Sequence, residues 1–171
     1  GDYQVHNKKT VLQTVAIINT QKDFKIYETD IKSGLLNVVK NTKLKGRWQQ
    51  LGEFPKIICD TAHNKNGLEI VMKQIQKEKY DTLHIVLGVV NDKDLNEVLP
   101  LFPTNAIYYF CKPNIPRGFD AKILQEKAAG FNLKGEVFNS VSDSYTAALQ
   151  NASKSDFIYI GGSTFVVAEI L

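Results

Sequence analysis

The sequence predicts an α/β fold: a mostly parallel sheet with helices on both faces, preceded by a short helical segment. Three observations predict it. After residue 46, short apolar runs typical of buried strands alternate with amphipathic helical patterns. Their connections are short, as in right-handed strand–helix–strand crossovers. Residues 1–45 carry helical patterns only. We therefore expect one Rossmann-like domain in residues 46–171, with a helical segment in front of it.

Two helices are expected in the first 45 residues. The first spans residues 4–18, and the second spans about 29–41, with Thr29 or Asp30 as its cap. Residues 43–46 form the expected hinge to the domain. The apolar side chains of the first helix fall on one face: Val11, Leu12, Val15 and Ile18. Because both helices carry apolar faces, we expect them to pack against the sheet domain or a neighbouring chain.

The elements of the domain alternate in order along the chain. The predicted strands are Trp48–Leu51, Ile57–Cys59, Leu83–Val89, Ala106–Phe110, Glu136–Phe138 and Phe157–Ile160. The predicted helices are about Gly67–Glu78, Leu95–Leu101, Ala121–Ala129, Ser142–Ala152 and Thr164–Leu171. The order of the strands in the sheet does not follow from the sequence.

The composition fits a piece of a cytoplasmic enzyme. With 171 residues, of which 43% are hydrophobic, the chain has enough apolar side chains for one core. No apolar run approaches the roughly 20 residues that cross a membrane, and no segment resembles a signal peptide. Cys59 and Cys111 each end an apolar strand and lack the spacing of metal ligands. We expect both to be buried free thiols in a reducing compartment.

Charge is distributed unevenly along the chain. Residues 1–50 hold nine Lys and Arg against four Asp and Glu, whereas residues 51–171 hold twelve against fourteen. The basic part either meets an anionic ligand, such as a nucleotide or a polyglutamate, or forms a solvated helical face. No basic stripe alternates with aromatic residues, so a nucleic-acid partner is not expected.

The segment from Lys56 to Gly67 combines a buried strand with a group of polar side chains. Asp60, His63 and Asn64 follow the strand directly, where open α/β sheets bind their ligands. They therefore form a candidate site. An alternative interpretation is that Asp60 and Asn64 cap the next helix and that His63 is a polar loop residue. The residues alone leave both interpretations open.

The motifs along the chain resemble a known family. Asp60-Thr61-Ala62-His63-Asn64 followed by Gly67 resembles the Asp-x-Ala-His-Asn signature of the carboxy-terminal domain of folylpolyglutamate synthase, often bifunctional with dihydrofolate synthase. This enzyme belongs to the ATP-dependent Mur ligase superfamily. Further segments match its motifs in the same order: Gly1-Asp2-Tyr3-Gln4-Val5-His6-Asn7, Gly46-Arg47-Trp48-Gln49, Gly88 to Asp94 with its Asp-Lys-Asp, Pro116-Arg117-Gly118 and Gly161-Gly162-Ser163. Tyr3 stands where the family usually has His.

The resemblance implies a domain organisation and a reaction. Residues 1–45 would be the helical tail of an upstream central ATPase domain with its linker, and 46–171 the Mur ligase-type carboxy-terminal domain. The intact enzyme phosphorylates a carboxylate of dihydropteroate or folate with ATP and Mg²⁺. The α-amino group of L-glutamate then attacks the acyl phosphate and forms an amide. The carboxy-terminal domain would close over the nucleotide and exclude water.

The same resemblance implies roles for individual residues. Arg47, Asp60 and Asn7 match nucleotide-binding positions, with Asp60 at the ribose and Asn7 near the adenine. His63 and Ser163 match positions for the incoming glutamate. Two further basic residues are weaker candidates: Lys93 either faces a phosphate or is neutralised by its acidic neighbours, and Arg117 lies in the Pro116-Arg117-Gly118 turn. No metal ligand and no catalytic residue is expected in this part of the enzyme.

The chain contains neither a Gly-x-x-x-x-Gly-Lys-Ser/Thr phosphate loop nor a Gly-x-Gly-x-x-Gly fingerprint. If the family interpretation holds, the phosphate loop and the Mg²⁺ ligands precede Gly1, in an amino-terminal ATPase domain missing here, and the fragment is expected to be inactive alone. Two alternatives remain open: a Mur ligase fragment of peptidoglycan synthesis, and a non-catalytic α/β binding module.

Overall fold

The computed structural model describes residues 3–92 and 94–171 and forms two compact units that divide between Lys45 and Gly46. Lys93, a candidate either for facing a phosphate or for neutralisation by its acidic neighbours, therefore lies outside the described residues. No helix in the described part of the chain is long and apolar enough to cross a lipid bilayer.

The amino-terminal unit is helical. Helix α1 (Gln4–Ile18) has the predicted bounds. The second predicted helix was wrong as a single element, because the chain forms α2 (Glu28–Leu36) and α3 (Val38–Thr42). At the break, the Asn37 side chain donates to the Ser33 carbonyl oxygen at 2.9 Å, a local bond that competes with helical continuation.

The predicted cap of the second helix also differs from the structure. Tyr27 is the cap residue, and Asp30 lies in the first turn, where its carboxylate accepts the Tyr27 backbone N–H at 3.0 Å. Helices α1 to α3 contain no buried residue among those that the structure describes. The expectation that their apolar faces pack on another surface stays a prediction.

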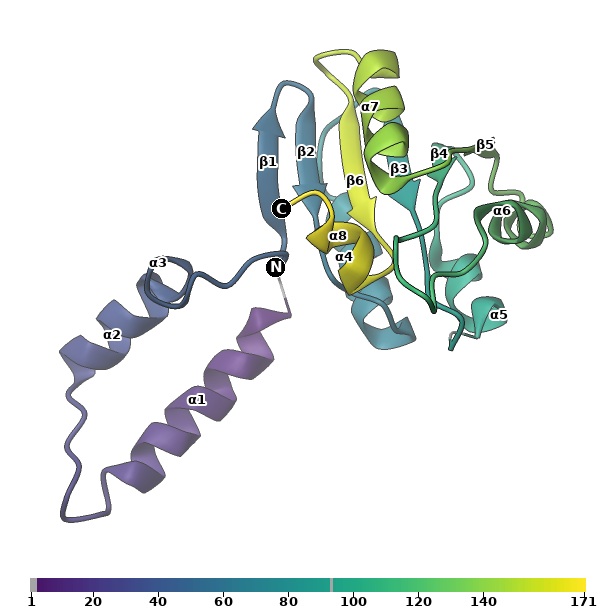
Figure 1. Ribbon diagram of the computed structural model, residues 1–171. Helices are drawn as coiled ribbons and strands as arrows, with labels where there is room; N and C mark the ends of the chain where they lie inside the picture. Colours follow the sequence, from purple (N-terminus) through teal and green to yellow (C-terminus); the bar gives the residue numbers. More distant parts are fainter. Residues whose placement is uncertain (1–2, 93) are drawn as a thin grey trace. The chain divides into compact units, whose positions relative to one another are not determined.

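The unit from Gly46 to Leu171 is built on a six-stranded, mostly parallel sheet, which confirms the predicted fold class (Figure 1). The strands are β1 (Gln49–Glu53), β2 (Lys56–Cys59), β3 (Leu83–Leu87), β4 (Ala106–Phe110), β5 (Gly135–Val137) and β6 (Phe157–Gly161). Their order is β1-β2-β6-β3-β4-β5, and only β1 is antiparallel to its neighbour. Each predicted strand is present, and its ends differ from the prediction by at most two residues.

The helices of this unit follow the predicted order. They are α4 (Lys65–Ile75), α5 (Leu95–Val98), α6 (Ala121–Ala129), α7 (Val141–Asn151) and α8 (Thr164–Ala168). The predicted helix Leu95–Leu101 continues after α5 as the 3-10 helix η1 (Leu99–Leu101), because Pro100 has no N–H for α-helical bonding. Helix α8 is shorter than predicted and ends at Ala168.

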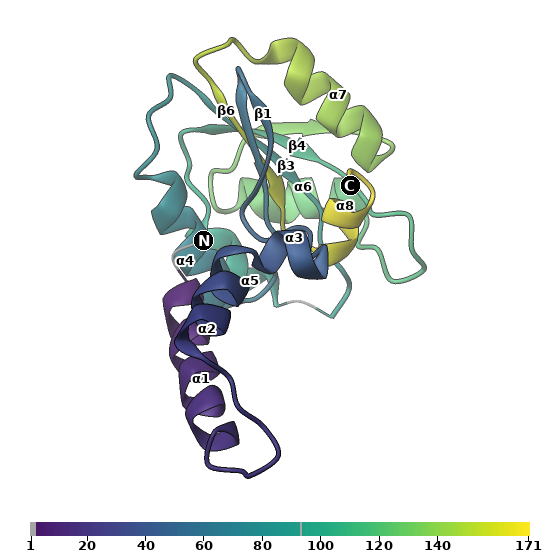
Figure 2. The ribbon, with the colours of Figure 1, turned by 90° about the vertical axis from the view of Figure 1, so that its left-hand side faces the viewer.

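Each face of the sheet has its own core. Helices α4, α5 and α6 cover one face, and α7 and α8 cover the other (Figures 1 and 2). The alternation of β6 shows the division, since Tyr159 packs with the first group and Ile158 and Ile160 with the second. A sheet buried on both faces explains why its central strands are continuous apolar runs.

The topology creates a crevice at one edge of the sheet. Strands β3 and β6 are parallel neighbours. The connection after β3 leads to α5 on one face, whereas the connection after β6 leads to α8 on the other. Loops that diverge in this way leave a ligand-sized opening at the carboxyl ends of the two strands.

Candidate functional site

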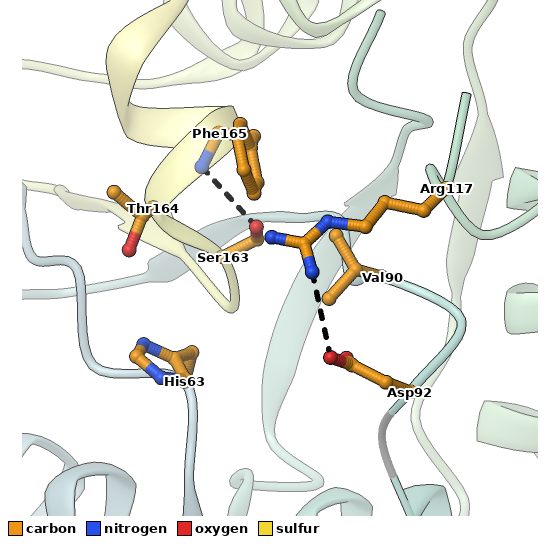
Figure 3. Close-up of a pocket in the computed structure, with 7 residues that line it drawn as sticks. All are labelled: His63, Val90, Asp92, Arg117, Ser163, Thr164 and Phe165. Carbon is orange, nitrogen blue, oxygen red and sulfur yellow. Dashed lines mark hydrogen bonds and ion pairs between the residues drawn. The ribbon is translucent and has the colours of Figure 1, made fainter. Parts of the chain in front are cut away.

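A pocket of about 130 Å³ opens at the carboxyl edge of the sheet, at this crevice (Figure 3). Its residues come from four segments that follow strands. His63 follows β2, Val90 and Asp92 follow β3, and Arg117 lies beyond β4. The loop after β6 and the start of α8 complete the lining with Ser163, Thr164 and Phe165.

Ser163 is fixed by the start of α8. It is the cap residue of the helix, and its hydroxyl oxygen accepts the Phe165 backbone N–H at 3.2 Å. Before it, Gly162 adopts a φ of +88°, which side chains other than glycine rarely tolerate. A Cβ at Gly162 would lie 2.7 Å from the Gly88 carbonyl oxygen, so the loops after β6 and β3 approach as only glycine allows.

His63 and Asn64 divide the roles that the sequence left open. Asn64 caps α4, because its side-chain oxygen accepts the Gly67 backbone N–H at 2.9 Å. His63 is exposed, its Nδ1 lies 2.9 Å from the Thr61 carbonyl oxygen, and its ring faces the pocket (Figure 3). The capping interpretation thus holds for Asn64, whereas His63 belongs to the pocket wall.

Asp60 is fully buried at the end of β2. One of its carboxylate oxygens accepts the Ala62 backbone N–H at 2.8 Å, and the other accepts the Trp48 N–H at 2.6 Å. Asp60 therefore does not cap α4. Its carboxylate joins the chain after β2 to the segment that enters β1, and this contact fixes the backbone next to Arg47.

Arg47 is exposed beside this contact. The preceding Gly46 has a φ of +71°, donates its N–H to the Gln49 side chain at 2.8 Å, and accepts the Thr61 N–H at 2.9 Å. Because β1 runs antiparallel to β2, its first residues lie at the edge where β2 ends. Arg47 and Asp60 therefore lie close to one another, as expected.

Arg117 reaches across the pocket from the loop after β4. Its guanidinium carbon lies 4.9 Å from the centre of the Phe165 ring, and Nη1 lies 3.6 Å from Asp92 Oδ2. The loop that carries Arg117 is tied to the loop after β3: the Arg117 carbonyl oxygen accepts the Asn91 N–H at 3.0 Å. Figure 3 shows the guanidinium near Ser163 and Phe165.

The structure thus brings His63, Ser163 and the weaker candidate Arg117 into one pocket. Asp60 and Arg47 do not line the pocket. They lie at the same edge of the sheet, because the Asp60 N–H donates to the Ile160 carbonyl oxygen of β6. Asn7 belongs to the amino-terminal unit, where its amide donates to Gln4 at 2.9 Å. Four lining residues were not predicted as ligands from the sequence: Val90 and Asp92, which lie within the motif from Gly88 to Asp94, and Thr164 and Phe165.

A second cluster of polar side chains, formed by His84, Tyr109 and Asp156, is buried in the domain and holds parts of the fold together. His84 is buried between Tyr109, whose hydroxyl is 2.9 Å from Nδ1, and Asp156, whose Oδ2 is 3.4 Å from Nε2. Burial alone raises the pKa of Asp156, but hydrogen bonds from the Ser153 and Thr82 N–H groups and from His84 outweigh it, so its pKa lies below the ordinary value.

Both cysteines are free and buried, as predicted. Burial raises the pKa of the Cys59 thiol to about 11, helped by the Asp60 charge, and that of Cys111 to about 12. Thiols in this state are protonated and unreactive at neutral pH. Within residues 3–92 and 94–171, no group of three His, Cys, Asp or Glu side chains is placed to hold a metal ion.

Fold and site together define a class: a Rossmann-like domain with a pocket at the carboxyl edge of a mostly parallel sheet, where neighbouring connections diverge and domains of this kind commonly bind ligands. Comparison with known families matches residues 46–164 to the family described as Mur ligase, glutamate ligase domain. The chain belongs to this family.

Known proteins with similar sequences and structures are enzymes of folate metabolism by name. The chain is 32% identical over 132 residues to a probable bifunctional folylpolyglutamate synthase/dihydropteroate synthase of Haloferax volcanii, which covers 77% of the chain and 16% of that protein. It superimposes with a TM-score of 0.76 and 28% identity on Escherichia coli FolC in complex with DHPP and ADP, over 86% of the chain and 34% of FolC.

A third match is the bifunctional folylpolyglutamate synthase/dihydrofolate synthase of Yersinia pestis, complexed with AMPPNP and a Mn ion. Its TM-score is 0.70 at 25% identity, and the match covers 86% of the chain and 34% of the enzyme. The chain thus spans about a third, or less, of the length of these three proteins.

Proposed function

We propose that this chain is the glutamate ligase domain of an ATP-dependent ligase that adds L-glutamate to dihydropteroate or folate. One observation carries the proposal: His63 and Ser163, which match glutamate positions of the family, line one pocket at the carboxyl edge of the sheet. The names of the similar proteins favour folate over the muramyl substrate of peptidoglycan synthesis, and an enzyme domain over a non-catalytic module.

The size of the pocket supports an amino acid as its ligand. Pockets that enclose drug-sized molecules have volumes of roughly 300–1,000 Å³. A pocket of about 130 Å³ is too small for a nucleotide and suits a compact polar molecule. The imidazole of His63 and the hydroxyl of Ser163 both offer hydrogen bonds to a carboxylate or an amine.

The nucleotide is proposed to bind beside this pocket, at Arg47. Its exposed guanidinium can donate two parallel hydrogen bonds to phosphate or ribose oxygens. Asp60 matches the ribose-binding position, yet it is fully buried and both of its oxygens accept backbone N–H groups. We therefore propose that Asp60 acts on the nucleotide mainly by holding the backbone at Trp48 and thereby positioning Arg47.

In the proposed reaction, ATP converts a carboxylate of the pterin substrate into an acyl phosphate. The α-amino group of glutamate attacks the carbonyl carbon, the amide bond forms, and phosphate leaves. This domain binds glutamate, orients its amine and excludes water, which otherwise hydrolyses the acyl phosphate. When bound, Mg²⁺ neutralises phosphate charge. The described residues offer no ligand set for it, so its ligands are assigned to another part of the enzyme.

The amino-terminal unit completes the proposed organisation. We propose that residues 1–45 are the helical tail and linker of a central ATPase domain, in which Asn7 lies near the adenine. Their uncovered apolar side chains support a role against another protein surface. Two buried free thiols support a cytoplasmic location, because such thiols are typical of reducing compartments.

The proposal is tested with the purified natural enzyme that contains this chain. ADP release is measured with dihydropteroate or a folate, with and without L-glutamate, and the product is identified by mass. We expect ADP release that depends on both substrates and a product one glutamyl group heavier. A UDP-linked muramyl peptide as the only accepted acceptor, or no ligation at all, would contradict the proposal.

A further inference from the structure

Arg117 and its two partners form an arrangement to which neither the family match nor the similar proteins assign a role. Arg117 lines the pocket together with His63 and Ser163, and it is the one arginine or lysine among the described lining residues. Its guanidinium lies over the Phe165 ring, at 4.9 Å from the ring centre. Such a cation–π contact orients the planar group without using its N–H donors.

The ion pair between Arg117 and Asp92 is loose. Nη1 and Oδ2 are 3.6 Å apart, beyond the 2.7–2.9 Å or so of a charge-assisted hydrogen bond. Both side chains are more than half exposed, at 57% and 58%, so solvent screens the pair. Exposed pairs of this kind contribute roughly 0–1 kcal/mol. A ligand carboxylate can therefore replace Asp92 at the Arg117 guanidinium with little loss of free energy.

The pocket wall carries charges of both signs, with the Arg117 guanidinium and the Asp92 carboxylate on neighbouring loops (Figure 3). A free amino acid such as glutamate carries the complementary charges, carboxylates and an amine. An arginine suits a carboxylate better than a lysine does, because its fixed fork donates two parallel hydrogen bonds.

We infer that Arg117, oriented by Phe165, is a specificity-determining residue that binds a carboxylate of the amino-acid substrate, with Asp92 as the counter-ion that it leaves. The inference rests on the proposed function and deepens it. Glutamate has two carboxylates, and the chemistry of the contact is the same for both. Analogues that lack the charge on one carboxylate distinguish them.

The test uses the natural enzyme and its Arg117→Ala variant, with three amino-acid substrates. L-Glutamine lacks the charge on the γ-carboxylate, and the α-amide of glutamate lacks it on the α-carboxylate. Removing Arg117 should raise KM for glutamate about 10- to 100-fold, the loss expected for one charge-assisted contact. One of the two analogues lacks the carboxylate that Arg117 binds. For that analogue, Arg117→Ala should change KM less than about threefold, because the contact is already lost and removing its second partner adds little.

Three controls separate charge from packing. Arg117→Lys keeps the charge and loses the fork, so it should recover part of the lost affinity. Phe165→Leu loses the ring that orients the guanidinium and should raise KM for glutamate by a smaller factor than Arg117→Ala does. Lys127→Ala removes an exposed charge in α6, outside the pocket lining, and should match the parent.

The inference is overturned if Arg117→Ala leaves KM for glutamate unchanged, or raises KM equally for glutamate and both analogues. In both cases the parent enzyme still ligates glutamate, so the proposed function stands. If the parent enzyme itself fails to ligate glutamate, the proposed function and the role of Arg117 fall together.

Discussion

At the scale of the residue, buried carboxylates in this domain organise backbone. Asp156 accepts N–H groups from Thr82 at 3.0 Å and from Ser153 at 2.6 Å, in addition to the contact with His84. Asp60 likewise accepts two N–H groups. In both places the carboxylate oxygens accept backbone N–H groups, and these bonds favour the charged form of a buried carboxylate.

Asp156 should therefore make the free energy of unfolding depend on pH in the acidic range. Replacing Asp156 by Asn puts an NH₂ group against an N–H donor and should lower the free energy of unfolding by about 2 kcal/mol at pH 7. The pKa of Asp156 is lowered on folding, so its contribution is complete above the unfolded pKa of about 3.9 and is lost as pH falls through the folded value. The difference between parent and variant should shrink on going from pH 7 to pH 3.

Urea unfolding followed by the fluorescence of Trp48, the single tryptophan, measures this difference. Asp81→Asn is a matched control: Asp81 is an exposed carboxylate of the adjoining loop, and its replacement should change stability by less than about 0.5 kcal/mol. A difference between Asp156→Asn and the parent that is equally large at pH 7 and pH 3 would show that the carboxylate charge is not its cause.

At the scale of the element, the loop after β6 sets the geometry of the pocket. Gly162→Ala forces a side chain into a φ of +88° and brings its Cβ to 2.6 Å from Leu87 Cδ1 and 2.7 Å from the Gly88 carbonyl oxygen. We expect a loss of about 2–4 kcal/mol in the free energy of unfolding, from backbone strain and overpacking together.

Gly130→Ala is the control for this substitution. Gly130 ends α6 with a φ of −61°, and an added Cβ would lie 3.3 Å from its nearest neighbour, the Lys127 carbonyl oxygen. Its stability should stay within about 0.5 kcal/mol of the parent. Urea unfolding compares the two variants, and equal stabilities would mean that the two loops can separate without cost.

The bounds of helices and strands were predictable from the sequence where a local pattern of residues determines them. Helices α1 and α6 and strand β4 have the predicted bounds, because each coincides with one apolar pattern in the sequence, and the Asp120 cap also marks the start of α6. The helix broken at Asn37 was not predictable from periodicity, since a single side-chain bond to Ser33 decides it. The 3-10 turn at Pro100 had a visible signal in the proline itself.

The site was predictable in part for a related reason. His63 and Ser163 follow strands directly, and parallel strands end at one edge, so their common location followed from the pattern. The contribution of Asp92, Phe165 and Val90 depends on the adjacency of β6 and β3, which is a property of strand order and cannot be read locally. The motif marked Asp60, yet only the structure shows that both of its oxygens bind backbone.

At the scale of the whole molecule, the two units play different parts in the proposal. The unit from Gly46 to Leu171 has two cores and a defined pocket, whereas the unit that ends at Lys45 has apolar side chains without cover. We propose that, in a longer enzyme, the helices pack on the ATPase domain and the pocket is brought to the acyl phosphate. We propose that the carboxyl edge of the sheet holds two sites, with the nucleotide at Arg47 and the amino acid at His63.

The two sites are distinguished by KM values measured in the natural enzyme. KM is measured for ATP and for L-glutamate in the parent, Arg47→Ala and His63→Ala. Arg47→Ala should raise KM for ATP about tenfold or more and change KM for glutamate less than about twofold, since one charged contact is lost at one ligand. His63→Ala should do the reverse. A parent-like KM for glutamate in His63→Ala, or equal shifts of both constants in both variants, would contradict the claim.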